Sequence, residues 1–117
     1  MEGVSNTVTG GMAHAEGYRN TVEGNCAHAE GHFNKALNRS EHACGQYNLS
    51  TQSTDKKLRT LFSIGNGNPD WEGVRHNAVE VKFNGDIYIQ SKTTTDKSDL
   101  NITYAPMKRL QTWLNEK

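Results

Sequence analysis

Residues 6–17 read NTVTGGMAHAEG, and residues 20–31 read NTVEGNCAHAEG. The two phrases are 14 positions apart, and a weaker third copy ends in HACG at residues 42–45. One column of the repeat holds glycines and another holds histidines, at Gly3, Gly17, Gly31 and Gly45 and at His14, His28 and His42. Coincidence over so many columns would be rare, so the N-terminal part of the chain is a repeat.

Each repeat divides into two halves of seven residues. Gly10 and Gly24 lie midway between the main glycines, and Asn38 takes this place in the third copy. Glycine and asparagine tolerate the left-handed backbone of tight corners. Between corners, small or apolar residues alternate with polar ones, as in the phrase AHAEG. This period of two predicts short strands joined by sharp turns, because a helix would need apolar residues at spacings of three and four.

We therefore predict one flat coil of two short strands per repeat, with coils stacked about 4.8 Å apart. The predicted turn glycines are Gly3, Gly10, Gly17, Gly24, Gly31 and Gly45. The third copy carries Leu37 in place of Thr or Glu and Glu41 in place of Ala, which predicts the edge of the roll at this point.

The composition agrees with a thin coil. Leu, Ile, Val and Phe account for 20 of 117 residues, while 13 basic residues balance 13 acidic ones. A low apolar share usually indicates disorder, but that inference also requires a large net charge. A narrow coil filled with Ala and Val explains the low share instead. Because such a coil buries little apolar surface, we infer that other copies of the chain complete the core.

Several classes of function are disfavoured by the sequence. Zero net charge argues against nucleic acid or an anionic membrane as partner. No stretch approaches the ~20 apolar residues of a membrane helix, and no signal-peptide pattern is present. Cys26 and Cys44 occupy different repeat positions and are predicted to be reduced, small apolar fillers. No nucleophile motif surrounds any serine, so we predict no enzyme, no catalytic residue and no cofactor.

Beyond the repeats, residues 58–64 are predicted to form a strand that stops at the turn-rich residues 65–70, followed by an exposed loop. Val79 and Val81 alternate with polar residues before Asn84-Gly85, and Ile87 and Ile89 continue the alternation. Asn-Gly between two alternating runs predicts a β-hairpin.

The C-terminal part is predicted to be a polar linker followed by a helix. Pro106 suits a first helical position, and Met107, Leu110 and Leu114 share one face of residues 107–117. We interpret this short helix as the start of a coiled coil. The predicted organisation is β-roll repeats over 1–50, a strand and hairpin cap over 51–92, and linker plus helix over 93–117.

The phrases NTVxG and AHAEG resemble the head repeats of trimeric autotransporter adhesins, which also occur in bacteriophage tail fibres and neck appendages. The resemblance covers Glu2 to about Asn48. It implies an all-β, left-handed parallel β-roll (a solenoid) packed as a homotrimer. Residues 61–67 (LFSIGNG) and 75–81 (RHNAVEV) are similar to segments that follow such repeats in phage tail proteins. Because Glu2-Gly3 already matches Glu16-Gly17, we expect the chain to be part of a longer fibre.

The histidine column has two interpretations. His14, His28 and His42 are expected to stack one coil apart, with Glu16 and Glu30 on the same outward face. Imidazole is a common metal ligand, but groups stacked about 4.8 Å apart do not converge on one ion. The preferred interpretation is a polar ladder, and no metal site is predicted.

A second candidate site lies in the loop around Trp71. An aromatic ring beside carboxylates and amides is typical of a glycan site, because the ring packs on C–H faces while polar groups bind hydroxyls. The alternative is that Trp71 fills the base of the hairpin or an interchain contact. The predicted ligand-binding group is Asp70, Trp71, Glu72, Arg75 and His76.

Together these features predict a structural or adhesive segment of a trimeric fibre, from a phage tail fibre or appendage that contributes to host attachment. Its expected partners are further copies of itself and a host-surface glycan or protein, and its expected location is the virion. Two alternatives remain open. One is a bacterial surface adhesin that binds host glycan or matrix. The other is part of a self-processing tail appendage, since some such appendages end in a self-cleaving chaperone domain.

Overall fold

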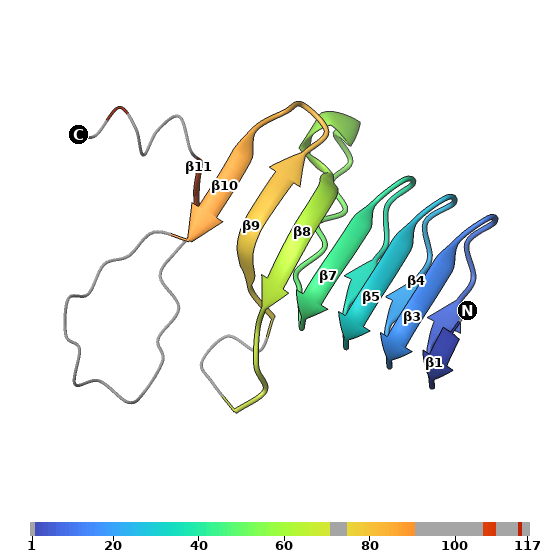
Figure 1. Cartoon of the computed structure of the whole chain (residues 1–117). Coiled ribbons are helices and arrows are strands. Elements are labelled where there is room, and N and C mark those ends of the chain that lie inside the picture. The colour runs from blue at the N-terminus through green and yellow to red at the C-terminus, as the bar shows by residue number, and fades with distance from the viewer. Residues whose placement is uncertain (1, 71–74, 91–106, 110–114, 116–117) are drawn as a thin grey trace.

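The repeats form a two-sheet β-solenoid (Figure 1). The computed structural model describes residues 2–70, 75–90, 107–109 and 115. The repeats contribute four parallel strands to the larger sheet, namely β1 (Glu2–Val4), β3 (His14–Tyr18), β5 (His28–His32) and β7 (His42–Gln46). The smaller sheet holds β2 (Thr7–Val8), β4 (Thr21–Val22) and β6 (Lys35–Ala36). His14 pairs with His28 and Thr7 with Thr21, so the predicted stack of 14-residue coils is confirmed.

The corners of the coil differ from the sequence prediction. Gly3, Gly17, Gly31 and Gly45 do have positive φ, between 85° and 107°. Gly10 and Gly24 do not. Left-handed backbone instead recurs every seven residues at non-glycine positions, namely Ser5, Met12, Arg19, Cys26, Phe33, Ser40 and Tyr47. The cost of this conformation is offset by hydrogen bonds between coils. For example, the Cys26 amide donates to the Gly11 carbonyl at 2.8 Å.

Gly10 and Gly24 are required by the close approach of neighbouring coils. A Cβ atom added to Gly24 would lie 2.0 Å from the carbonyl oxygen of Asn38, and one at Gly10 would lie 2.2 Å from that of Gly24. Such contacts are far inside van der Waals distance. Glycine recurs at these two positions because the stacked backbones lie too close together for a side chain. The sequence pattern alone does not distinguish this requirement from a requirement for positive φ.

The interior of the solenoid is thin and rich in alanine. Its buried apolar residues are Ala15, Val22, Ala27, Ala29, Ala36 and Ala43. Beside them runs a column of asparagines, in which the Asn20 side-chain oxygen accepts from the Asn34 amide at 2.8 Å. The Asn34 oxygen in turn accepts from the Asn48 amide at 3.1 Å. The predicted Ala/Val filling is thus confirmed, and amide side chains complete the remaining space.

The smaller sheet ends at Glu41. In the first two coils, the amides of Thr9 and Gly10 donate to the carbonyl oxygen of Val22, and those of Glu23 and Gly24 donate to that of Ala36, in each case in the next coil. The corresponding amides of the third coil, Leu37 and Asn38, donate instead to Glu41 Oε1 at 3.2 and 3.0 Å. The carboxylate therefore replaces the carbonyl that a further strand would provide, which agrees with the predicted edge of the roll.

Beyond the repeats, the larger sheet continues without a break. A 3₁₀ turn, η1 (Lys56–Leu58), precedes β8 (Thr60–Asn66), which pairs in parallel with β7. Strands β9 (Asn77–Lys82) and β10 (Ile87–Gln90) follow as an antiparallel hairpin. The predicted hairpin at Asn84-Gly85 is confirmed, and Gly85 has a φ of 89°.

The start of the predicted C-terminal helix is wrong. Residues 107–109 form β11 (Met107–Arg109), which pairs antiparallel with β10 and extends the sheet to eight strands. A short helix is marginal by itself, whereas the free edge of β10 offers a row of hydrogen-bonding partners. The rest of the predicted helix lies almost entirely outside the described residues. Within the part of the chain that the structure describes, no helix is long and apolar enough to cross a membrane.

Candidate functional site

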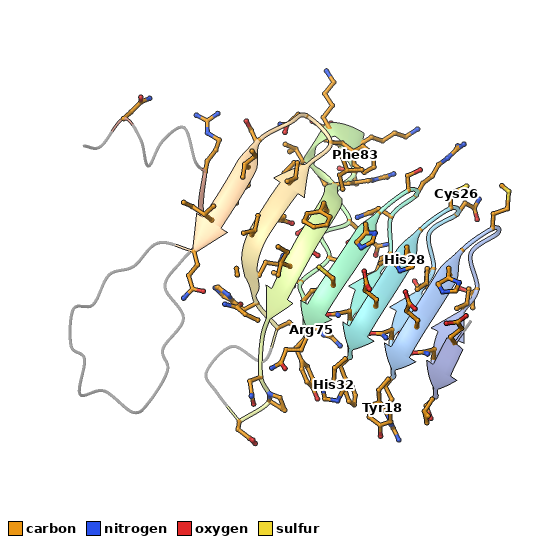
Figure 2. The ribbon with its side chains drawn as sticks, in the orientation of Figure 1. Tyr18, Cys26, His28, His32, Arg75 and Phe83 are labelled. Atoms are coloured by element: carbon orange, nitrogen blue, oxygen red, sulfur yellow. The ribbon has the colours of Figure 1, made fainter. Side chains whose placement is uncertain are left out.

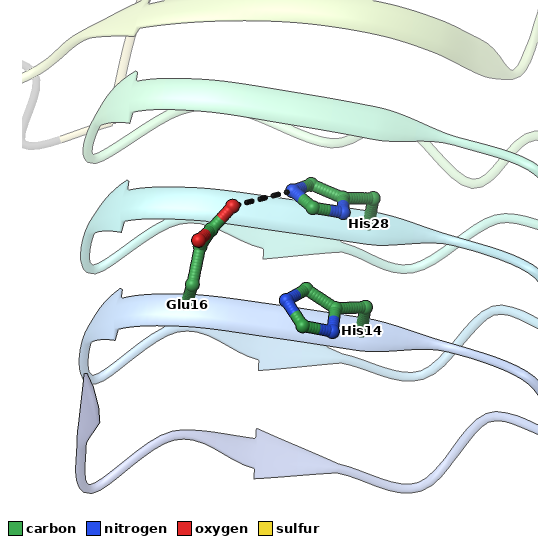
Figure 3. A group of neighbouring side chains, drawn as sticks. All are labelled: His14, Glu16 and His28. Carbon is green, nitrogen blue, oxygen red and sulfur yellow. Dashed lines mark ion pairs between the residues drawn. The ribbon is translucent and has the colours of Figure 1, made fainter. Parts of the chain in front are cut away.

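The histidine column is a ladder of stacked rings on the outer face of the larger sheet (Figure 3). The ring centroids of His14 and His28 are 5.0 Å apart with planes inclined by 19°. Those of His28 and His42 are 4.8 Å apart and inclined by 9°. The in-register pairing of β3, β5 and β7 positions these rings, because equivalent residues lie directly above one another.

Each glutamate of the ladder reaches up to the histidine of the next coil. Glu16 Oε1 lies 3.4 Å from His28 Nε2, and Glu30 Oε1 lies 3.2 Å from His42 Nε2. All four side chains are partly exposed, so each contact contributes little to stability. The arrangement is a polar strip that links the coils in sequence.

Two groups within this ladder have metal-ligating atoms that all lie within 4.8 Å of one another. They are His14, Glu16 and His28, and His28, Glu30 and His42. An imidazole nitrogen binds a metal ion in the plane of its ring, and nearly parallel stacked planes do not meet at a common point. A tetrahedrally coordinated zinc ion also requires imidazole nitrogens at about 2.0–2.1 Å from the metal. As the side chains lie, the ladder holds His–Glu pairs, and metal binding would require the rings to turn.

The residues predicted around Trp71 are only partly described. Trp71 and Glu72 lie outside the described residues. The guanidinium of Arg75 donates from Nη1 to the carbonyl oxygens of Phe33 and Asn48 at 2.8 and 3.1 Å, which ties Arg75 to the solenoid.

Arg75 is half-buried, and Asp70 and His76 make local contacts in the same region. Burial lowers the pKa of the Arg75 guanidinium from its ordinary value. His76 Nδ1 contacts the Asn66 side-chain oxygen at 2.8 Å, while the Asp70 amide donates to the Asn68 side chain at 2.9 Å. These contacts give Arg75 and His76 structural roles. Ligand binding by the group stays a hypothesis.

A row of aromatic rings at one corner of the coils was not predicted. Phe33 and Tyr47 stack with centroids 4.8 Å apart and planes inclined by 8°, and Tyr18 stacks on His32 at 5.4 Å. Arg75 lies over the Tyr47 ring, with 5.7 Å from its guanidinium carbon to the ring centroid. Tyr18, His32 and Arg75 gather at the same end of the strands in Figure 2. The sequence signal was an aromatic or histidine at 14-residue spacing, but its repeat columns are too irregular to stand out.

The same outer face becomes apolar beyond β7. Phe62 pairs with His42 and Ile64 with Cys44, and β9 then places Val81 beside Phe62 and Val79 beside Ile64. Strand β10 adds two further isoleucines to this face, Ile87 and Ile89. We call these six residues of β8, β9 and β10 the apolar face, namely Phe62, Ile64, Val79, Val81, Ile87 and Ile89. Ile64 and Ile87 are 38% and 37% exposed.

Both cysteines are free thiols in the structure. Cys44 is half-buried, and burial together with the nearby Glu30 carboxylate raises the pKa of its thiol. The predicted filler role is wrong for Cys26, which is exposed at a left-handed corner.

No family model matches the chain, and comparisons with curated proteins and with solved structures find no match either. Any functional assignment therefore rests on the residues and their geometry.

Proposed function

We propose that this chain is a structural segment of a homotrimeric fibre, part of a bacteriophage tail fibre or appendage that contributes to host attachment. The resemblance of its repeats to trimeric adhesin heads supports the proposal. In this arrangement three left-handed rolls pack around one axis, and the C-terminal segment leads into a trimeric stalk. The expected location is the virion.

The observation that carries the proposal is the apolar face. A sheet in a monomeric protein buries its apolar side against another layer. Here the buried layer of the solenoid consists of five alanines and one valine, while six larger apolar side chains of β8, β9 and β10 stay on the outer face. A contiguous apolar surface of this kind indicates an interaction site.

The partner that we propose for this face is a further copy of the chain. The register of parallel coils gives every copy the same strip of His–Glu pairs next to the same apolar face. Three-fold packing would place identical strips side by side around one axis, because closed symmetry is the common way for identical chains to associate. The chain then contributes mechanical length and stiffness rather than chemistry.

Sedimentation velocity and light scattering of the purified chain test this proposal. We expect a species of three times the 13.0 kDa chain mass at micromolar concentration. A stable monomer that keeps its strand content across this concentration range would overturn the trimeric fibre, and a stable dimer would overturn its symmetry. A full-length gene that encodes a secretion signal and a membrane anchor would favour the bacterial adhesin.

A further inference from the structure

A cavity of about 400 Å³ lies where the last coil meets the hairpin. Its walls are Asn38, Arg39, Ser40, Lys56, Arg59 and Phe83. They come from three segments that are distant in the sequence: a corner of the third coil, the turn η1 with its following residue, and the residue after β9. The volume falls in the ~300–1,000 Å³ range typical of small-ligand sites.

The charge of this cavity is positive, although the chain as a whole is neutral. Arg39, Lys56 and Arg59 line it, and no acidic side chain does. Among the described residues, none of these three cations forms an ion pair with a carboxylate. Arg59 donates from Nε to the Ser53 carbonyl at 2.7 Å, which fixes the guanidinium and leaves its two terminal nitrogens for a ligand.

Backbone hydrogen bonds hold the walls of the cavity in place. The Phe83 amide donates to the Arg59 carbonyl at 3.1 Å, and the Asn84 amide donates to the Lys57 carbonyl at 3.0 Å. The buried Asn38 side chain donates to the carbonyl oxygens of Thr51 and Thr60 at 2.9 and 3.2 Å. Because the cavity is already formed, a ligand would not have to order these segments.

Phe83 adds an aromatic surface to the cationic wall. Its side chain is 41% exposed, and it lies at the end of the strands opposite the aromatic corner (Figure 2). An exposed aromatic ring packs well against the C–H faces of a sugar, while the exposed Ser40 supplies a hydroxyl group that can hydrogen-bond a sugar hydroxyl. A bare anion would use the cations alone and leave the ring without a function.

We propose that this cavity binds a phosphorylated saccharide. A phosphate monoester carries a charge of about −1.5 to −2 near pH 7 and offers several acceptor oxygens, which suits two arginines and a lysine. Phe83 contacts the sugar ring. The inference does not rest on the proposed fibre function, although it would supply a receptor class for host attachment.

Isothermal titration and amide chemical-shift titration of the folded chain test the proposal, with glucose 6-phosphate, glucuronate, inorganic phosphate and glucose as probes. We expect glucose 6-phosphate to bind most tightly, glucose to show no binding, and the affinity to fall with added salt. Equal affinity for inorganic phosphate and glucose 6-phosphate would overturn the saccharide part. Tighter binding of glucuronate than of glucose 6-phosphate would overturn the phosphate preference. Absence of binding for all four probes would overturn the proposed site.

Matched variants locate the binding. Lys56→Gln is expected to weaken glucose 6-phosphate binding about tenfold, because it removes a charge-assisted hydrogen bond. Lys57→Gln, at the adjacent position of η1 outside the cavity, is expected to leave binding unchanged. Phe83→Ala is expected to reduce the affinity for glucose 6-phosphate to that for inorganic phosphate. Equal losses in the two lysine variants would show diffuse attraction by surface charge and overturn the site. Oligomeric mass, measured on the same samples, reports separately on the fibre proposal.

Discussion

Glu41 Oε1 lies 3.0 Å from the backbone nitrogen of Asn38 and 2.8 Å from its side-chain nitrogen, so one carboxylate oxygen accepts both hydrogen bonds. The same oxygen accepts from the Ser50 hydroxyl at 2.8 Å. Its companion Oε2 is buried with no hydrogen-bond partner. Glu41 therefore closes the end of the smaller sheet with one oxygen, while its other oxygen is buried without a hydrogen-bond partner. Protonation of this carboxyl is for that reason coupled to folding.

The stability of the chain should depend on the protonation of Glu41. Burial raises the pKa of its carboxyl from 4.5 to about 7, against the opposing effect of its hydrogen bonds. Between these two values the folded chain binds more protons than the unfolded chain. The stabilising contribution is therefore complete below pH 4.5 and is lost as the pH rises through about 7, for a total of roughly 3 kcal/mol.

Glu41→Gln tests this dependence. We expect its free energy of unfolding to exceed that of the wild type at pH 8, by up to about 3 kcal/mol, and to match it near pH 4.5. Urea unfolding at constant protein concentration measures both values. Glu23→Gln, at an exposed position, is the control and should follow the wild-type curve. A parallel pH curve for Glu41→Gln would contradict the assigned role.

Asn34→Ala should be strongly destabilising. The Asn34 side chain donates to the carbonyl oxygens of Glu30 and Gly45 at 2.6 and 2.7 Å and accepts from the buried Asn48 amide. Removing it leaves these groups without partners, at a cost of about 1–3 kcal/mol for each buried group. Asn6→Ala, at the more exposed end of the same column, should cost less in thermal unfolding. Equal losses of stability in the two variants would show that burial of the asparagine column is unimportant.

Substitution by alanine at Gly11 and at Gly24 should change the stability of the chain in opposite directions. At Gly24 the added Cβ would meet the Asn38 backbone oxygen at 2.0 Å, so the coils must separate. At Gly11 the nearest atom is the Asn25 side-chain oxygen, at 3.5 Å. We expect Gly24→Ala to destabilise by about 3 kcal/mol or more and Gly11→Ala to stabilise by up to about 1 kcal/mol. Similar midpoints of thermal unfolding would argue against close stacking.

Ile64→Lys should prevent association if the apolar face is the interface between chains. Ile64 lies on that face, on β8 beside Val79 of β9, and a buried lysine without a partner is costly. Leu58→Lys is the control, because Leu58 is 43% exposed and lies on η1, away from the apolar face. We expect a monomer for the first variant and a trimer for the second in sedimentation. Trimers for both would place the interface elsewhere.

Zinc should have no effect on the thermal midpoint of the wild type. The stacked rings of His28 and His42 direct their nitrogens along nearly parallel planes, so they do not surround one ion. We therefore expect equal midpoints in EDTA and in micromolar zinc. A rise with zinc that is absent in His28→Ala would refute this expectation, because His28 belongs to both candidate groups.

Much of the fold could be predicted from local pattern. The 14-residue columns predicted which residues pair, because parallel coils in register repeat the same environment at each level. The Asn84-Gly85 turn was equally local. The start of the C-terminal helix was wrong because β11 depends on the free edge of β10, which is a feature of the assembled sheet.

The candidate sites were harder to predict for the same reason. The His–Glu ladder follows from the repeat alone, since His14, Glu16 and His28 are brought together by registry. The cationic cavity does not, because Arg39, Lys56 and Phe83 share no column or motif and meet only where three segments converge.

By itself, the sequence determined the length of the coil, the identity of its stacked residues and its small interior. With a period of 14 residues, matching side chains lie above one another only when each coil is 14 residues long. Only the tertiary structure decided where left-handed corners fall, which oxygen closes the last coil, and which distant cations share a cavity. Those outcomes depend on distances between backbones and between segments, and a linear pattern carries no such distances.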